Sequence, residues 1–255
     1  MERTTPELLL RRLDEIGASL ARRDDAVALL GLGSVGLDTH RLDEHSDLDF
    51  FAVVEAEALP RYLDSIDWLE DAHPVAYSFR NTRDGRKALF ADGVWCEYAV
   101  FAPAQLAEIP FARGRIVWQR ADAPAGLDTP SRRPPSLEGS DRDFHANEAL
   151  TQLYVGLHRE LRGERLSAMR LIQVHAVERA IALLALERPE APQQDPFAAE
   201  RGVELRFGAD ELPLAEFVQG YDRNRESALA LLAWLEAHAD PDATLAAEIR
   251  RLAAT

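Results

Sequence analysis

Residues 31–54 constrain the fold more than any other stretch of this chain. An apolar run over residues 26–32 stops at closely spaced glycines, a polar loop continues to Ser46, and a second apolar run fills residues 50–54. A short apolar run that ends in glycines is typical of a buried strand entering a tight turn. We therefore predict two buried strands joined by a glycine-rich turn and a polar loop.

The turn after the first strand has the composition of an anion site. Gly33 and Gly36 lack the β-carbon that would hold a phosphate away from the backbone, and Ser34 adds a hydroxyl group. Backbone amides in such a turn can meet a negatively charged ligand. Gly33 and Ser34 are the residues that we expect to bind it.

Two acids stand at the entrance to the second strand. In an extended chain alternate side chains share a face, so Asp47 and Asp49 project together while Leu48 points into the core. Two neighbouring carboxylates repel each other unless a cation lies between them, and oxygen ligands favour Mg²⁺. The spacing predicts a divalent metal site.

A third acid, Glu97, interrupts a strand-like apolar and aromatic run over residues 93–101. Upstream, the pair Asp84 and Gly85 is a strong turn signal between two further strand-like runs. Glu97 is thus expected in a hairpin-rich sheet beside the strand of Asp47, as a metal ligand or as a base.

Acids are common in this chain, with 44 Asp and Glu among 255 residues, so an Asp-x-Asp pattern alone is weak. Similar pairs at residues 55 and 57, 141 and 143, and 240 and 242 are interpreted as solvated surface. The order of strand, Gly-Ser turn, polar loop, paired acids, strand and later acid distinguishes residues 31–54 from them.

With these residues in place, the chain resembles the polymerase-beta-like nucleotidyltransferase superfamily, in particular the antibiotic nucleotidyltransferases that modify lincosamides and aminoglycosides. The resemblance rests on Gly33, Ser34, Asp47, Asp49 and Glu97. The helical segments after residue 147 also resemble the C-terminal part of the lincosamide branch.

The resemblance implies a mechanism. Two Mg²⁺ ions would join the carboxylates to a nucleoside triphosphate, and a substrate hydroxyl would attack the α-phosphorus and expel pyrophosphate. Asp47 and Asp49 would be metal ligands, and Glu97 would ligate metal or accept the hydroxyl proton. Gly33 and Ser34 would hold the β- and γ-phosphates. The basic residue that often follows the serine in this superfamily is absent, so we expect phosphate binding to use backbone, metal and a distant arginine.

Charge and composition narrow the partners. The net charge is −15 and Lys87 is the single lysine, whereas a protein that binds a polynucleotide needs a basic surface. We therefore expect a small, cationic acceptor molecule and no nucleic-acid or membrane partner. The lone Cys96 excludes an internal disulfide, and the absence of a signal-like segment favours the cytoplasm. Cys96 is interpreted as a packed strand residue.

Proline-rich composition over residues 121–141 indicates a domain boundary. We predict an α+β fold: a mixed-sheet nucleotidyltransferase domain over residues 1–125, a linker over 126–141, and an all-α helical bundle over 142–255. Helical periodicity marks residues 6–23, 59–68, 143–162, 165–187, 223–238 and 242–253. An apolar stripe through Leu150, Leu153, Tyr154, Leu157 and Leu161 is expected to be core.

The sequence thus predicts a Mg²⁺-dependent enzyme that transfers a nucleoside monophosphate, AMP from ATP, to a hydroxyl of a small molecule. Two alternatives stay open. One is AMP transfer to a protein side chain, as in toxin–antitoxin relatives, and the other is a catalytically silent nucleotide-binding regulatory module.

Overall fold

The computed structural model describes residues 4–132, 141–188, 195 and 197–255. Contacts divide the chain into two compact units, Met1–Pro134 and Pro135–Thr255. The first contains a six-stranded sheet, and the described part of the second contains helices only. The predicted order of a mixed-sheet domain followed by a helical one is confirmed.

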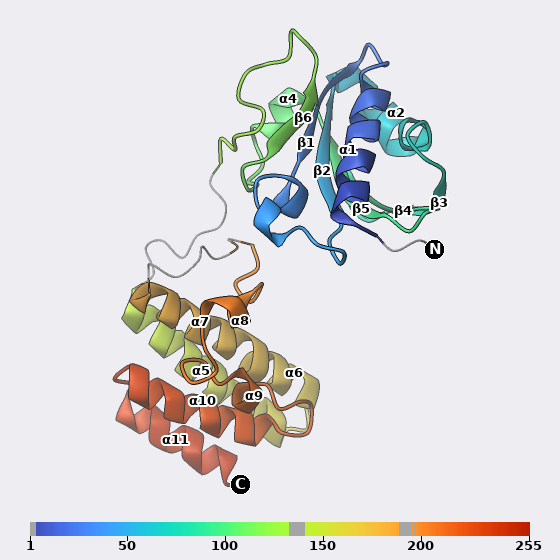
Figure 1. The fold of residues 1–255 in the computed structure, drawn as a ribbon. Helices are drawn as coiled ribbons and strands as arrows, with labels where there is room; N and C mark the ends of the chain where they lie inside the picture. Colours follow the sequence, from blue (N-terminus) through green and yellow to red (C-terminus); the bar gives the residue numbers. More distant parts are fainter. Residues whose placement is uncertain (1–3, 133–140, 189–194, 196) are drawn as a thin grey trace. The chain divides into compact units, whose positions relative to one another are not determined.

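The sheet has the strand order β3-β4-β5-β2-β1-β6 (Figure 1). β2 and β5 run parallel, while the pairs on either side of them are antiparallel. The chain therefore leaves β2, forms the β3–β4 hairpin, and returns along β5 directly beside β2. The strands are β1 Ala26–Gly31, β2 Leu48–Val54, β3 Val75–Arg80, β4 Gly85–Phe90, β5 Trp95–Phe101 and β6 Arg115–Gln119.

One face of the sheet is covered by α1 (Pro6–Leu20), α2 (Leu59–Asp64) and α3 (Asp67–Glu70). The Thr5 hydroxyl caps α1 by accepting from the Leu8 N–H, which satisfies one of the free amides of its first turn. α1 ends before the predicted residue 23. The predicted helix over residues 59–68 is two short helices, because Ser65 between them is extended.

The other face is only partly covered. The short helix α4 (Pro103–Leu106) and the buried side chains of Phe111 and Leu127 pack where β1, β2 and β5 carry Leu30, Val53 and Phe101. Toward the beginning of β2 and β5 the same face is half-exposed, and there the side chains become polar.

Residues 126–132 are part of the first unit and pack within it. Leu127 is buried, and the Gly114 N–H donates to the backbone oxygen of Asp128 at 2.9 Å. The rest of the predicted linker of residues 126–141 includes residues 133–140, which fall outside the described residues. The domain limits at 125 and 142 stay a prediction.

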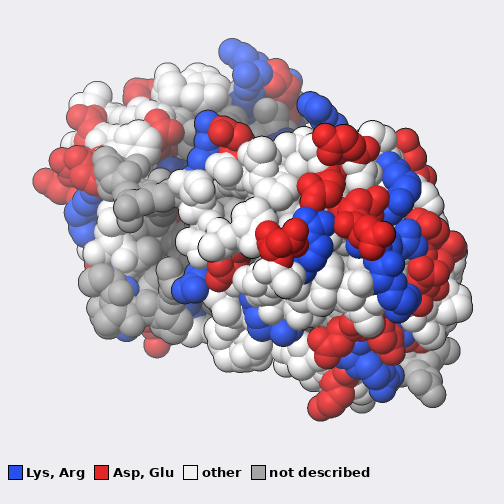
Figure 2. Space-filling view, turned by 90° about the horizontal axis from the view of Figure 1, so that it is seen from above, with Lys and Arg blue, Asp and Glu red and all other residues white. Residues whose placement is uncertain are grey.

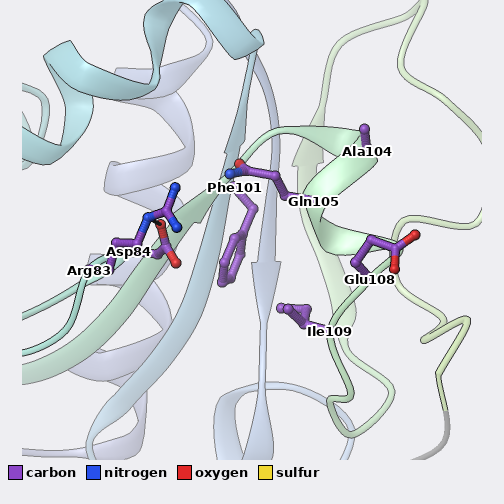
Figure 3. A pocket seen from close by; sticks show the side chains of 7 residues that line it. All are labelled: Arg83, Asp84, Phe101, Ala104, Gln105, Glu108 and Ile109. Carbon is purple, nitrogen blue, oxygen red and sulfur yellow. Dashed lines mark ion pairs between the residues drawn. The ribbon is translucent and has the colours of Figure 1, made fainter.

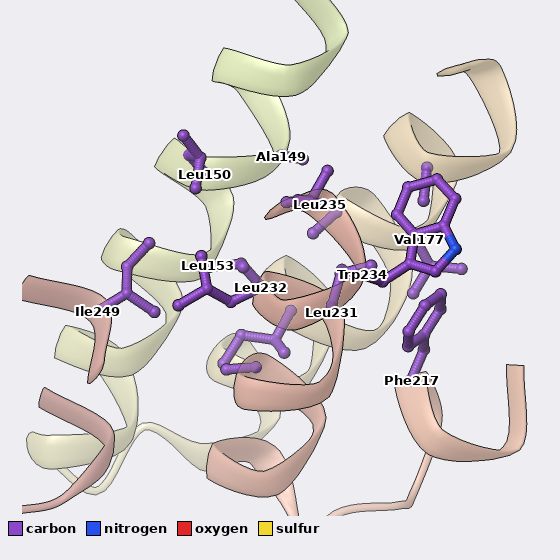
Figure 4. Packing of buried hydrophobic residues seen from close by; sticks show 14 of the residues in the cluster. Ala149, Leu150, Leu153, Val177, Phe217, Leu231, Leu232, Trp234, Leu235 and Ile249 are labelled. Atoms are coloured by element: carbon purple, nitrogen blue, oxygen red, sulfur yellow. The ribbon is translucent and has the colours of Figure 1, made fainter. Parts of the chain in front are cut away.

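The second unit packs its helices around one apolar core, part of which Figure 4 shows. Leu150, Leu153 and Leu157 are fully buried there and Tyr154 packs against them, as the stripe predicts. Leu161 is 38% exposed, so its assignment to the core was wrong; it is the last residue of its helix. The helices are α5 Arg142–Leu161, α6 Arg165–Met169, α7 Ala176–Glu187, α8 Val203–Arg206, α9 Leu214–Phe217, α10 Asn224–His238 and α11 Ala243–Ala253.

The predicted single helix over residues 165–187 contains a π-helical stretch, Arg170–His175, between α6 and α7. The buried Gln173 lies in this stretch. Its amide donates to the side-chain oxygen of Asn224 at 2.6 Å and its oxygen accepts from the Gly220 N–H at 2.8 Å. The wider turn is thus tied to the beginning of α10 by a paired buried amide.

Within the part of the chain that the structure describes, no helix combines the length and the apolar character needed to cross a bilayer.

Candidate functional site

The half-exposed end of the open sheet face brings three charged residues into one row. The Cα atoms of Asp49 and Glu97 are register partners on β2 and β5, and Glu97 is in turn the partner of Lys87 on β4. Register partners place their side chains on the same face. We call Lys87, Glu97 and Asp49 the charged row.

Both oxygens of the Glu97 carboxylate have partners. The Lys87 Nζ lies 2.8 Å from Oε2, and the Asn81 side-chain amide donates to Oε1 at 3.0 Å. Asn81 comes from the turn between β3 and β4, so the hairpin holds the acid from two positions. The position of Glu97 within an apolar strand is therefore accompanied by one ion pair and one hydrogen bond to its carboxylate.

The charges of all three predicted acids act on the Lys87 ammonium. Its hydrogen bond to Glu97 and the charge of that carboxylate raise the pKa of the Lys87 ammonium. The negative charges of Asp49 and Asp47 act in the same direction. Asp47 immediately precedes β2, and Leu48 between the two aspartates is fully buried, as predicted. The charges of Asp47, Asp49 and Glu97 therefore all act on the Lys87 ammonium, and Glu97 is the acid that pairs with it.

Within the described ranges, no group of three or more His, Cys, Asp or Glu residues is arranged to hold a metal ion. At the charged row the Lys87 ammonium takes the contact with Glu97 instead. The carboxylate oxygens of these acids are nonetheless the donor type that a hard divalent cation prefers, and they already attract the Lys87 ammonium. Metal ligation by Asp47, Asp49 and Glu97 stays a prediction.

The glycine-rich turn lies beside Asp49. Gly33 has a φ of +50°, which favours glycine, and a β-carbon built on it would lie 3.7 Å from the Asp49 Oδ2. The Leu32 N–H donates to the Asp49 backbone oxygen at 2.8 Å. The predicted phosphate turn of Gly33 and Ser34 is therefore a direct neighbour of a predicted metal ligand.

Gly36 has a different role from the one expected. A β-carbon there would lie 2.7 Å from the backbone oxygen of Gly31 and 2.8 Å from the carbonyl carbon of Leu32. Gly36 is needed because the turn closes on itself, with the Gly36 N–H donating to the Gly33 oxygen at 3.0 Å. The absence of a β-carbon at Gly36 allows the backbone of Gly31 and Leu32 to approach, and this is a different role from contact with a phosphate.

Sequence reasoning missed three residues at this site. Two are Lys87 and Asn81; the third is Arg115 on β6, whose guanidinium donates to the Val35 oxygen of the turn at 3.1 and 3.3 Å. Arg115 is the register partner of Gly31. A lone lysine in a strand was an available signal for Lys87, whereas Arg115 could be located only after strand pairing was known.

Cys96 is fully buried on the opposite face of β5, and burial raises the pKa of its thiol to about 12. A thiol of this kind is protonated at neutral pH and is a weak nucleophile. The interpretation of Cys96 as a packed strand residue agrees with its position.

An open depression of about 350 Å³ lies at the far end of β5 (Figure 3). Arg83 and Asp84 stand on one side of Phe101, and residues of α4 and the segment after it, among them Gln105 and Glu108, stand on the other. Neither the charged row nor the glycine-rich turn contributes to its lining. The depression is therefore separate from the predicted site.

Acidic and basic side chains are mixed over the surface. On the face shown in Figure 2, Lys and Arg lie among Asp and Glu rather than gathering into one field. Many arginines among the described residues form ion pairs, as Arg120 does with Glu55 and Asp122. The expectation that no nucleic acid is bound stays a prediction from the net charge.

Comparisons with known proteins give structural neighbours only. No protein-family model and no curated protein matches the chain. An aminoglycoside 6-adenyltransferase from Bacillus subtilis is similar in structure at a TM-score of 0.32 and 12% identity, covering 96% of this chain and 91% of its own. A nucleotidyltransferase-like protein from Exiguobacterium sibiricum has a TM-score of 0.34 and 11% identity, covering 89% of this chain and 74% of its own. At these values the chains superpose loosely, and the description of the fold rests on the chain's own sheet and helices.

Proposed function

We propose that this chain is a nucleotidyltransferase that moves a nucleoside monophosphate, AMP from ATP, to a hydroxyl group of a small cationic molecule with the help of Mg²⁺. The observation that carries the proposal is the contact between the Gly33 turn and Asp49, whose register partner is Glu97. A glycine turn with free space for an anion's approach and paired oxygen donors beside it are what this chemistry requires.

Each residue of the proposed site has its own role. Gly33 and Ser34 bind the triphosphate tail, and Arg115 supplies positive charge behind the turn. Asp47 and Asp49 would hold Mg²⁺, which neutralises charge on the attacking and leaving oxygens when bound. Glu97 completes the metal site or accepts the hydroxyl proton.

The reaction is an in-line displacement. The acceptor oxygen forms a bond to the α-phosphorus as the bond to the pyrophosphate oxygen breaks, and the hydroxyl proton passes to Glu97 or to water. Because the entering and leaving oxygens are opposite each other, a triphosphate tail at the β1–β2 turn places the acceptor toward β4 and β3.

That side of the sheet carries exposed rings. Tyr77 is 52% exposed and Phe79 is 41% exposed, with their ring centroids 5.9 Å apart. Phe79 is the register partner of Lys87, and Tyr77 is the partner of Leu89. An apolar surface beside acids suits an acceptor with a ring face and a positive charge.

Truncating these rings is expected to weaken acceptor binding selectively. Phe79→Ala and Tyr77→Ala should each raise the acceptor KM by about three- to tenfold, since such contacts contribute about 0.5 to 1.5 kcal/mol. The KM for ATP, measured in the same steady-state assay, serves as the internal control and should stay within about twofold of the wild-type value. An equal rise in both KM values would contradict an acceptor-side position for the rings.

The proposed function is tested by pyrophosphate release from ATP and Mg²⁺ with a panel of aminoglycosides and lincosamides. Release should depend on the acceptor and should disappear in Asp47→Asn, with the nucleotidylated product identified by mass. Transfer of AMP to proteins of an added cell extract, with no product from any small acceptor, would favour AMP transfer to proteins. Binding of ATP with no turnover on any acceptor, small or protein, would favour a regulatory module.

A further inference from the structure

The Lys87 contact with Glu97 has consequences for how the site is charged. A metal ion that uses the Glu97 carboxylate must replace a contact that is only 2.8 Å long. The other oxygen of the Glu97 carboxylate accepts a hydrogen bond from the Asn81 amide at 3.0 Å, which fixes the orientation of the carboxylate. Lys87 and an incoming cation therefore compete for one oxygen.

The competition extends beyond a single pair. The charges of both predicted aspartates also attract the Lys87 ammonium, in addition to its 2.8 Å contact with Glu97. Without a cation, three carboxylates near the beginning of two neighbouring central strands would repel one another. A fixed ammonium relieves that repulsion and keeps the acids close in the metal-free protein.

We propose that Lys87 is a built-in counter-cation of this site: it holds the carboxylates together when no metal is bound and weakens metal binding by competing for Glu97. The inference rests on the proposed function, because it takes the same acids as metal ligands. It assigns Lys87 a positioning role and makes metal occupancy depend on what else enters the site. A triphosphate, which brings four negative charges at most, favours the exchange of Lys87 for metal by adding ligands for both cations.

The test is a titration of Mn²⁺ into the full chain without nucleotide, with free Mn²⁺ followed by electron paramagnetic resonance. Lys87→Met removes the charge but keeps an unbranched side chain, and should bind Mn²⁺ about three- to tenfold more tightly than the wild type. Lys87→Arg keeps a cation and should stay within about twofold of the wild type.

Two controls separate the proposal from other effects. Arg11→Met makes the same change in net charge on α1, which covers the opposite face of the sheet, and its 65% exposed side chain should leave Mn²⁺ binding unchanged. Thermal unfolding in a chelator should give a lower Tm for Lys87→Met than for the wild type, with a larger rise in Tm when Mn²⁺ is added. A folding defect alone would lower the Tm without increasing that rise.

The outcomes are distinct for the two proposals. Equal Mn²⁺ affinity of the wild type and Lys87→Met, or weaker binding in the variant, would overturn the role of Lys87 and leave the proposed function standing. If the wild type binds no Mn²⁺ at millimolar concentration with or without ATP, the metal-dependent function itself is wrong and the inference falls with it.

Discussion

Asp49→Asn is expected to reduce nucleotidyl transfer by a factor on the order of 10³, because an amide replaces an anionic ligand where the metal ions would neutralise transferring phosphate charge. The Tm of the metal-free variant should be unchanged or raised, since one of several crowded carboxylates loses its charge. Pyrophosphate release and thermal unfolding measure the two effects on the same sample.

Asp122→Asn is the matched control for this substitution. Asp122 is a 71% exposed acid that pairs with Arg120 at the surface, and its replacement should leave turnover near the wild-type rate. Turnover of Asp49→Asn within about tenfold of the wild type would remove Asp49 from the metal site. A loss of several kcal/mol in the free energy of unfolding would mark it as a structural acid instead.

Gly36→Ala is expected to damage both folding and nucleotide binding. The new methyl group would lie 2.7 Å from the Gly31 oxygen, and because the atoms it meets belong to the backbone, the turn itself must move. We expect the free energy of unfolding to fall by about 1 to 3 kcal/mol and the KM for ATP to rise by about tenfold or more. Urea denaturation and steady-state kinetics measure these values.

Gly208→Ala provides the comparison. A β-carbon at Gly208 would meet only the flexible carboxylate of Glu211, at 3.7 Å, so this variant should keep the stability and the ATP KM of the wild type within about 0.5 kcal/mol and twofold. If Gly36→Ala behaves in the same way, the turn tolerates movement and its present geometry is not what binds the phosphates.

Local pattern was enough to predict part of this site. Period-two alternation places Leu48 in the core and the two aspartates together, and the Asp-Gly pair marks the hairpin that precedes Glu97. These features depend on neighbours in the sequence, which is why they could be read from it.

The rest depends on which strands pair. The contact of Lys87 with Glu97 and the position of Arg115 beside the turn follow from the sheet order and register, which no local pattern encodes. The same reason explains Gly36: only the path of the closed turn shows that its β-carbon would strike the Gly31 carbonyl. Roles in chemistry remain predictions for all of these residues.

The parallel pairing of β2 with β5 has a consequence for how such a chain can diversify. Asp49 and Glu97 lie on central strands that have neighbours on both sides, whereas the aromatic rings and Asn81 belong to a hairpin at the margin of the sheet. If the proposed function holds, exchanges along that hairpin other than at Asn81 and Lys87, which contact Glu97, would alter acceptor preference and leave the contacts of the acids in place. A library of variants at the other positions of residues 75–90 is therefore where we expect altered acceptor preference to be found first.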